Sequence, residues 1–128
     1  MVDYLSDEWF AEYQRMGENL PEAGGATITM QYVVSGGTDG DVRYYVILEE
    51  GRITKVERGN ADKADVTLSM KHENAVKLQQ GQLNPSTAVM TGKVKSRGNM
   101  KMLMGLLPVL NSPGYQQFER RLCEITDF

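Results

Sequence analysis

The spacing of hydrophobic residues changes along this chain of 128 residues. From Ser6 to about residue 18 they recur near every third or fourth position, which predicts an amphipathic helix capped by Ser6. Between residues 27 and 70 they alternate with polar residues, as is typical of strands with one buried face. The predicted strands cover residues 27–34, 42–49, 52–57 and 65–70. In the third, Ile53 and Val56 are out of phase by one residue, which predicts a β-bulge.

Helical spacing returns after residue 71 and is interrupted by one more strand. The predicted elements are helices over 72–80 and 84–90, a strand over 93–97, a helix from residue 99 and a last helix from residue 113. Gly81 is expected to end the first of these helices. Asn84 followed by Pro85 begins the second, because Asn caps a helix and Pro is tolerated at its first position. Pro108 is expected to break or kink the helix from residue 99, because proline removes a backbone hydrogen bond.

The helix from residue 99 is apolar over more than half of its circumference, so it is expected to be mostly covered. Met100, Leu103, Met104 and Leu107 fall at i, i+3, i+4 and i+7 and therefore share one face. The chain has eight methionines, whose unbranched side chains adapt to neighbours of different shape. Two interpretations stay open: these residues line a space that holds a hydrophobic ligand, or they pack as an ordinary core.

Length and composition predict a single cytoplasmic domain over residues 1–128. Cys123 is the only cysteine, so neither a disulfide nor a cysteine-based metal site is expected within the chain. The first residues include acids and no apolar run, which does not fit a signal peptide, and nowhere do about 18 apolar residues run together. His72, the only histidine, has no nucleophile or metal partner in its spacing. We therefore expect no catalysis, no metal and no cofactor.

The net charge is −3, and the densest basic group consists of Lys93, Lys95, Arg97 and Lys101. This group is either a solvated strand face and helix start or a weak contact with an anionic membrane, worth about 1 kcal/mol per basic residue near the surface. Nucleic-acid binding is not expected, because the domain is acidic overall and no aromatic residues interleave with the basic group. A homodimer stays open as a further partner.

The stretch from Asp65 to Leu107 carries a longer pattern: DVTLSM, a short helix, and then G-x-L-N-P-x-x-A-x-M-x-G-K-x-K-x-x-G-N-M. This pattern resembles the sterol carrier protein 2 family, also called the sterol-transfer or lipid-transfer domain, over about a third of the chain. The matching residues are Asp65, Val66, Thr67, Leu68, Gly81, Leu83, Asn84, Pro85, Ala88, Met90, Gly92, Lys93, Lys95, Gly98, Asn99 and Met100.

The resemblance implies an α+β fold in which helices cover one face of a five-stranded, mostly antiparallel mixed sheet and enclose an apolar tunnel. It implies a non-enzymatic carrier of a fatty acid, acyl-CoA, sterol or isoprenoid. By position, the expected ligand-binding residues are Met30, Tyr32, Val46, Leu48, Met70, Met90, Met100, Leu103, Met104, Leu107, Phe118 and Leu122.

Two further points bear on how such a carrier would work. Ligand entry requires a movable cover, and the segment after Pro108, with Gly105 and Gly114 on either side, is expected to supply it. The alternative function is a protein-interaction or accessory module with the same fold and a filled cavity. A ligand carrier encloses a void, whereas an interaction module exposes an apolar patch of several hundred Å².

Overall fold

The computed structural model describes residues 1–20, 27–37 and 40–128. The main sheet has the strand order β4-β3-β2-β5-β6, and only the central β2–β5 pair is parallel. Its strands are β2 (Ile28–Gly37), β3 (Gly40–Glu49), β4 (Arg52–Arg58), β5 (Val66–Lys71) and β6 (Val94–Gly98). The predicted five-stranded mixed sheet is therefore confirmed. The glycines at 24 and 25, after which the strand pattern begins, and the tip of the β2–β3 hairpin lie outside the described residues.

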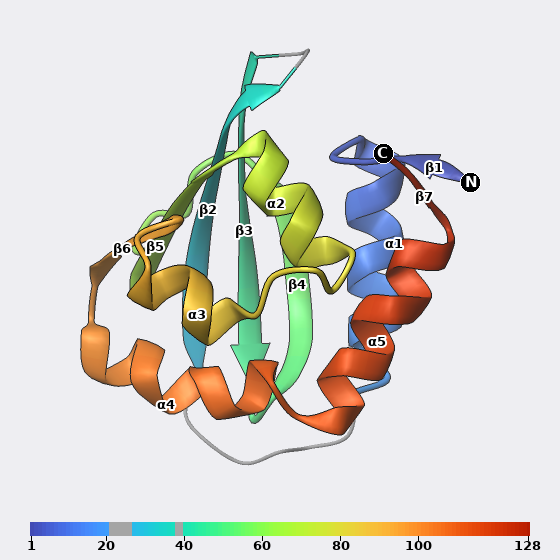
Figure 1. The fold of residues 1–128 in the computed structure, drawn as a ribbon. Helices are drawn as coiled ribbons and strands as arrows, with labels where there is room; N and C mark the ends of the chain where they lie inside the picture. Colours follow the sequence, from blue (N-terminus) through green and yellow to red (C-terminus); the bar gives the residue numbers. More distant parts are fainter. Residues whose placement is uncertain (21–26, 38–39) are drawn as a thin grey trace.

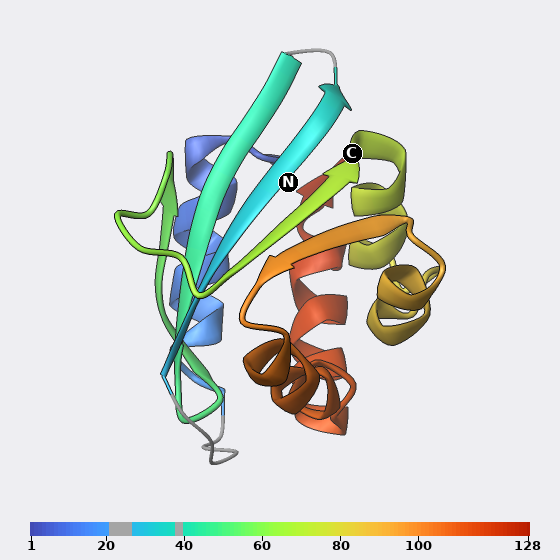
Figure 2. The same ribbon diagram turned by 90° about the vertical axis from the view of Figure 1, so that its left-hand side faces the viewer.

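The helices cover one face of this sheet (Figures 1 and 2). They are α1 (Asp7–Gly17), α2 (His72–Gln79), α3 (Pro85–Met90), α4 (Met100–Leu110) and α5 (Pro113–Glu124). In Figure 1, α1 and α5 lie side by side, and both views place α3 and α4 at the opposite side of the domain, near β5 and β6. Predicted caps are present, since the side chains of Ser6 and Asn84 both accept backbone hydrogen bonds from the first turns of their helices.

The hairpin of β3 and β4 shows how local sequence determines register. Glu50 and Gly51 form its two-residue turn with φ of 54° and 86°, and two positive φ values are characteristic of a type I′ turn. Ile47 pairs with Lys55 whereas Leu48 pairs with Ile53, so one residue of β4 is extra. The predicted bulge is confirmed, and it returns both Ile53 and Val56 to the buried face.

The prediction that Pro108 breaks its helix is wrong, because α4 continues to Leu110. The hydrogen bond that Pro108 removes is the one to the Met104 carbonyl, and since both residues are exposed, this carbonyl lies on the solvent side of α4. A sharp change of direction comes instead at residues 111–112, where Ser112 caps α5 and Pro113 occupies its first turn, as predicted.

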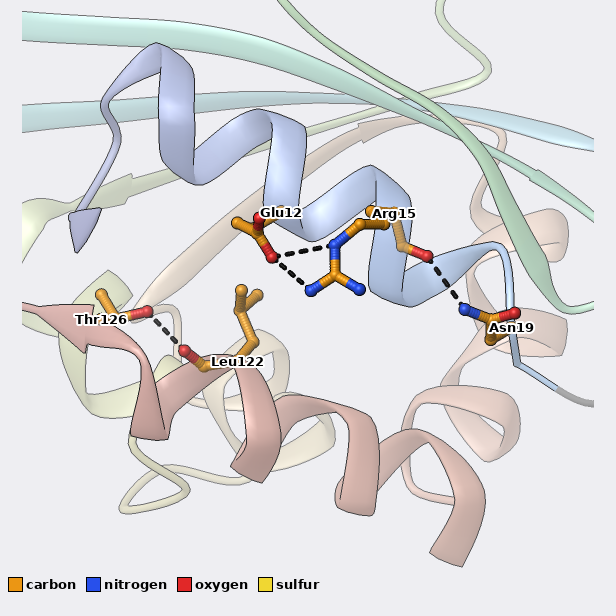
Figure 3. A network of polar contacts seen from close by, with 5 residues as sticks. All are labelled: Glu12, Arg15, Asn19, Leu122 and Thr126. Carbon is orange, nitrogen blue, oxygen red and sulfur yellow. Dashed lines mark hydrogen bonds and ion pairs between the residues drawn. The ribbon is translucent and has the colours of Figure 1, made fainter. Parts of the chain in front are cut away.

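The two ends of the chain meet in a short parallel pair that the sequence pattern did not predict. β1 (Val2–Asp3) pairs with β7 (Thr126–Asp127), which closes the domain beside α1 and α5 (Figure 1). The Thr126 hydroxyl donates to the Leu122 carbonyl oxygen at 2.5 Å and ends α5, as Figure 3 shows. The same figure shows the ion pair between Arg15 and Glu12 on α1.

Candidate functional site

A cavity of about 390 Å³ lies between the inner face of the sheet and the helices. This volume falls within the range of about 300–1,000 Å³ that is usual for small-molecule sites. Its apolar wall is formed mainly by Leu68, Met70, Leu78, Leu83, Val89, Val94, Leu103, Leu107 and Leu110. Its polar wall is formed by Tyr4, Tyr13, Tyr32, Tyr44, Gln79, Tyr115 and Glu119. The cavity is therefore amphipathic.

The cavity opens between the α2–α3 connection and α5. Exposed residues of its lining mark this rim, namely Gly81, Gln82 and Asn84 on one side and Arg120 on the other. Asn111, at the end of α4, bonds to two residues near the rim. Its side chain donates to Ser86 Oγ at 2.9 Å and accepts from Asn84 Nδ2 at 3.3 Å. These two hydrogen bonds join α3 to the α4–α5 junction.

The polar wall is built from tyrosines that come from five separate segments. The rings of Tyr32 and Tyr44, neighbours on β2 and β3, stack with centroids 4.9 Å apart, and the hydroxyls of Tyr13 and Tyr115 lie 3.5 Å apart. Burial raises the pKa of Tyr13, Tyr44 and Tyr115 well above the ordinary value. These hydroxyls therefore stay neutral at physiological pH and are able both to donate and to accept hydrogen bonds.

Glu119 places a carboxyl group beside these tyrosines. The Gln79 amide donates to its Oε2 atom, and the Tyr115 hydroxyl makes a second hydrogen bond with it. Burial raises the pKa of Glu119 to about 7, although both hydrogen bonds act in the opposite direction. Glu119 is therefore poised to lose its proton near neutral pH.

This raised pKa predicts how the free energy of unfolding changes with pH. Because folded Glu119 keeps its proton up to about pH 7 while the unfolded chain releases it near 4.5, stability falls as pH rises through this window, by about 3 kcal/mol at most. Glu119→Gln should remove this fall, since glutamine keeps an acceptor oxygen for Gln79. Urea unfolding from pH 4.5 to 8 measures the effect. Glu124→Gln, an exposed carboxyl on the same helix, is the control, and an equal change in both variants would contradict the assignment.

The structure divides the twelve residues that were expected to bind ligand into three groups. Tyr32, Met70, Leu103 and Leu107 line the cavity. Met30, Val46, Leu48, Phe118 and Leu122 are buried in the core outside the cavity lining. Met90, Met100 and Met104 are 86%, 39% and 63% exposed, so their placement in the tunnel is corrected.

The corrected positions have simple causes. In α4 the buried residues are Leu103, Leu106, Leu107 and Leu110, which also follow the spacing i, i+3, i+4 and i+7. The helix turns this stripe inward, and Met100 and Met104 therefore face solvent. Met90 is the last residue of α3, whose inner side is formed by Ala88 and Val89 instead.

The polar wall was the part that sequence reasoning missed. Tyr4, Tyr13, Tyr44, Tyr115, Gln79 and Glu119 line the cavity but were not among the expected residues. The available signal was Tyr115, which recurs with Glu119 at i and i+4 and therefore shares a helix face with it.

Other candidate groups form no reactive cluster among the described residues. No set of three or more His, Cys, Asp and Glu side chains is placed to hold a metal in the ranges 1–20, 27–37 and 40–128. The ring of His72 packs against Tyr4 with centroids 5.7 Å apart. Burial raises the pKa of the Cys123 thiol, which disfavours the reactive thiolate. Within the same ranges, no helix has both the length and the apolar character needed to cross a membrane.

Comparison with curated proteins finds partial matches. Hydroxysteroid dehydrogenase-like protein 2 of Bos taurus is 41% identical over 51 residues, which are 40% of this chain and 12% of that protein. Sterol carrier protein 2 of Gallus gallus is 43% identical over 56 residues, which are 43% of this chain and 10% of that protein. The matched part of the chain thus corresponds to about a tenth of the length of these relatives.

Solved structures and a family model extend the similarity to most of the chain. A conserved hypothetical protein from Thermus thermophilus, described as possibly sterol carrier protein, superimposes with a TM-score of 0.74 at 13% identity, covering 95% of this chain and 91% of that one. Palmitated SCP2L2 from Aedes aegypti gives a TM-score of 0.61 at 19% identity, covering 84% and 92%. Both share the fold. The family model described as the SCP-2 sterol transfer family matches residues 17–111, and the chain therefore belongs to this family.

Proposed function

We propose that this chain is a non-enzymatic lipid carrier and that the tunnel implied by its sequence corresponds to the cavity beside Tyr32 and Leu103. The observation that carries this proposal is a cavity of about 390 Å³ in a domain of 128 residues, with one apolar wall. Family membership supports it, and so does the palmitate in the description of the Aedes aegypti relative.

The expected affinity follows from the buried hydrocarbon. Each buried CH₂ group contributes about 0.8 kcal/mol, so a long acyl chain contributes on the order of 10 kcal/mol before the cost of association. A dissociation constant near 1 μM, which corresponds to about −8.2 kcal/mol, is therefore expected.

Ligand entry in this proposal uses the rim rather than the whole last helix. Tyr115, Phe118 and Leu122 bury the inner side of α5, so this helix acts as a fixed wall. The Asn111 contacts with Asn84 and Ser86 are exposed or partly buried and are able to open at small cost. The movable cover is therefore proposed to be the α3–α4 contact. Location in the cytoplasm and formation of a homodimer remain predictions.

Native mass spectrometry of the purified protein, with organic extraction of what co-purifies, tests the carrier function. A stoichiometric adduct of a few hundred daltons supports it and names the ligand class. A clean apo mass, without uptake of fatty acids, fatty alcohols, sterols or quinones offered in excess, would instead favour the interaction module with a vestigial cavity.

A membrane contact is proposed through the exposed methionines of α4. Met100 and Met104 flank Lys101 on α4. The remaining basic residues, Lys93, Lys95 and Arg97, are exposed just before and along β6, the strand that precedes this helix. Apolar side chains beside basic ones fit an anionic bilayer surface, where each basic residue contributes about 1 kcal/mol.

Vesicle binding tests this contact. Lys101→Gln should weaken binding to phosphatidylserine-containing vesicles about fivefold, which is the fold-change that about 1 kcal/mol produces. Lys77→Gln removes the same charge at an exposed position of α2 and should leave binding unchanged. Sedimentation with vesicles measures both. Equal losses in the two variants, or equal binding to neutral phosphatidylcholine vesicles, would argue against a specific membrane face.

A further inference from the structure

One carboxyl group, that of Glu119, borders the same cavity as the five tyrosines of the polar wall. Burial raises the pKa of all five phenols, and the charge of Glu119 adds a smaller increase at each: Tyr4, Tyr13, Tyr32, Tyr44 and Tyr115. They come from the segment after β1 and from α1, β2, β3 and α5, which are far apart in the sequence. The fold therefore assembles a single polar centre that borders the cavity.

Packing alone does not explain this carboxyl. Glu119 accepts a hydrogen bond from Gln79 and shares one with Tyr115, while a carboxylate offers about four acceptor positions. Acceptor positions therefore remain on Glu119, which lines the cavity. Its partial burial also lowers stability near neutral pH, and a group that destabilises the fold is a candidate for a functional role.

The charges around Glu119 restrict which lipid head group can lie there. Among the described lining residues the cationic side chain is Arg120, which is exposed at the rim. A fatty-acid carboxylate beside Glu119 would place two like charges together, so one of them would have to keep a proton. An alcohol O–H instead donates to Glu119, and its oxygen accepts from a tyrosine hydroxyl.

We propose that the cavity selects a long-chain lipid alcohol over the corresponding fatty acid, and that Glu119 is the residue that sets this preference. The inference rests on the proposed carrier function and adds the chemical class of the buried head group. The acyl or isoprenoid chain lies against Leu103, Leu107 and Leu110, and the hydroxyl lies against Glu119 and Tyr115.

The preference depends on pH through Glu119. The groups around it are Tyr13 from α1, Tyr32 and Tyr44 from the sheet, Gln79 from α2, and Tyr115, Arg120 and Cys123 from its own helix, with Tyr4 after β1 and His72 packed against Tyr4. The buried tyrosines stay neutral across the range tested, because burial raises their pKa. Palmitate affinity should fall as pH rises above about 7, by up to tenfold per pH unit, whereas hexadecanol affinity should change little.

The test uses the full chain, stripped of lipid, with tritiated 1-hexadecanol or palmitate delivered from cyclodextrin at pH 6 and pH 8.5. Wild type should bind hexadecanol at least tenfold more tightly than palmitate at pH 8.5, and the ratio should shrink at pH 6. Glu119→Gln should bring the two affinities within about threefold at both pH values. The exposed control Glu124→Gln should behave as wild type.

Each outcome distinguishes this inference from the carrier function. Equal binding of both lipids by wild type at pH 8.5, or a preference that Glu119→Gln does not change, overturns the role of Glu119 and leaves the carrier function standing. If Arg120 held the palmitate carboxylate at the rim, away from Glu119, the Glu119→Gln variant would leave the preference unchanged. Binding of neither lipid by wild type overturns the carrier function and the inference together. The pH profile of wild type decides the question even if the variant does not fold.

Discussion

Replacing Ala75 by tryptophan should abolish lipid uptake while the fold persists. Ala75 lies on α2, is 4% exposed and borders the cavity, so an indole at this position enters the space proposed for the ligand. Displacing about four to six CH₂ groups removes about 3–5 kcal/mol of binding free energy, and affinity should fall at least 100-fold. Binding of tritiated palmitate and hexadecanol measures the loss, and the far-UV circular dichroism spectrum should stay unchanged.

The matched control is Lys77→Trp, which adds the same side chain to the exposed side of the same helix. It should bind lipid as wild type does. Overpacking costs roughly 1–3 kcal/mol where no space exists, so a thermal midpoint close to that of wild type in Ala75→Trp would also indicate that the cavity is empty in the free protein. Undiminished uptake by folded Ala75→Trp would mean that the ligand, if one binds, lies elsewhere.

The strands were predictable because apolar and polar residues alternate along them, and only one register places all the apolar residues on the buried face. A shift of one residue would turn Met30 and Tyr32 to solvent, so the pattern of β2 and its neighbours fixes both the strand and its inner face. The same reasoning located the bulge near Ile53, where the alternation slips by one residue. Helix caps at Ser6 and Asn84 were equally local and equally predictable.

The orientation of α4 was not predictable from periodicity alone. This helix is apolar over most of its surface, and two overlapping stripes, one beginning at Met100 and one at Leu103, satisfy the same spacing. Packing against the sheet and α5 selects the second stripe, which is a tertiary effect. The eight methionines of the chain favoured the prediction that Met100 and Met104 line the tunnel, but both residues are exposed.

The polar wall lay beyond sequence reasoning for a different reason. Its members come from segments up to 115 positions apart, from Tyr4 to Glu119, and nothing in their local spacing says that they meet. Tyr32 was expected to bind ligand in an apolar tunnel, and its hydroxyl was not considered. The short β1–β7 pair brings Tyr4 close to this site, and two-residue strands carry no periodic pattern.

Trp9→Ala should cause a large loss of stability. Trp9 is fully buried on α1, and its ring packs edge-on against Tyr4 and Tyr13 with centroids 4.9 and 5.2 Å apart. Its Nε1 atom donates to Thr126 Oγ1 at 3.1 Å, which ties α1 to β7. Removing such a side chain costs about 3–5 kcal/mol, a large share of the roughly 6–19 kcal/mol expected for 128 residues. Urea unfolding measures this loss. It is followed by circular dichroism, because Trp9 is the only tryptophan and the variant therefore has no tryptophan fluorescence to follow.

Trp9→Phe separates the packing of the ring from its hydrogen bond. Phenylalanine keeps an aromatic ring among Tyr4 and Tyr13, while Thr126 loses a donor but still donates to the Leu122 carbonyl (Figure 3). This variant should therefore lose only about 1–2 kcal/mol. Since Tyr4 and Tyr13 both line the cavity, Trp9→Phe should also keep its preference for hexadecanol. A loss below about 1.5 kcal/mol in Trp9→Ala, against the range expected for a buried tryptophan, would show that the α1–β7 contact is not part of the stable core.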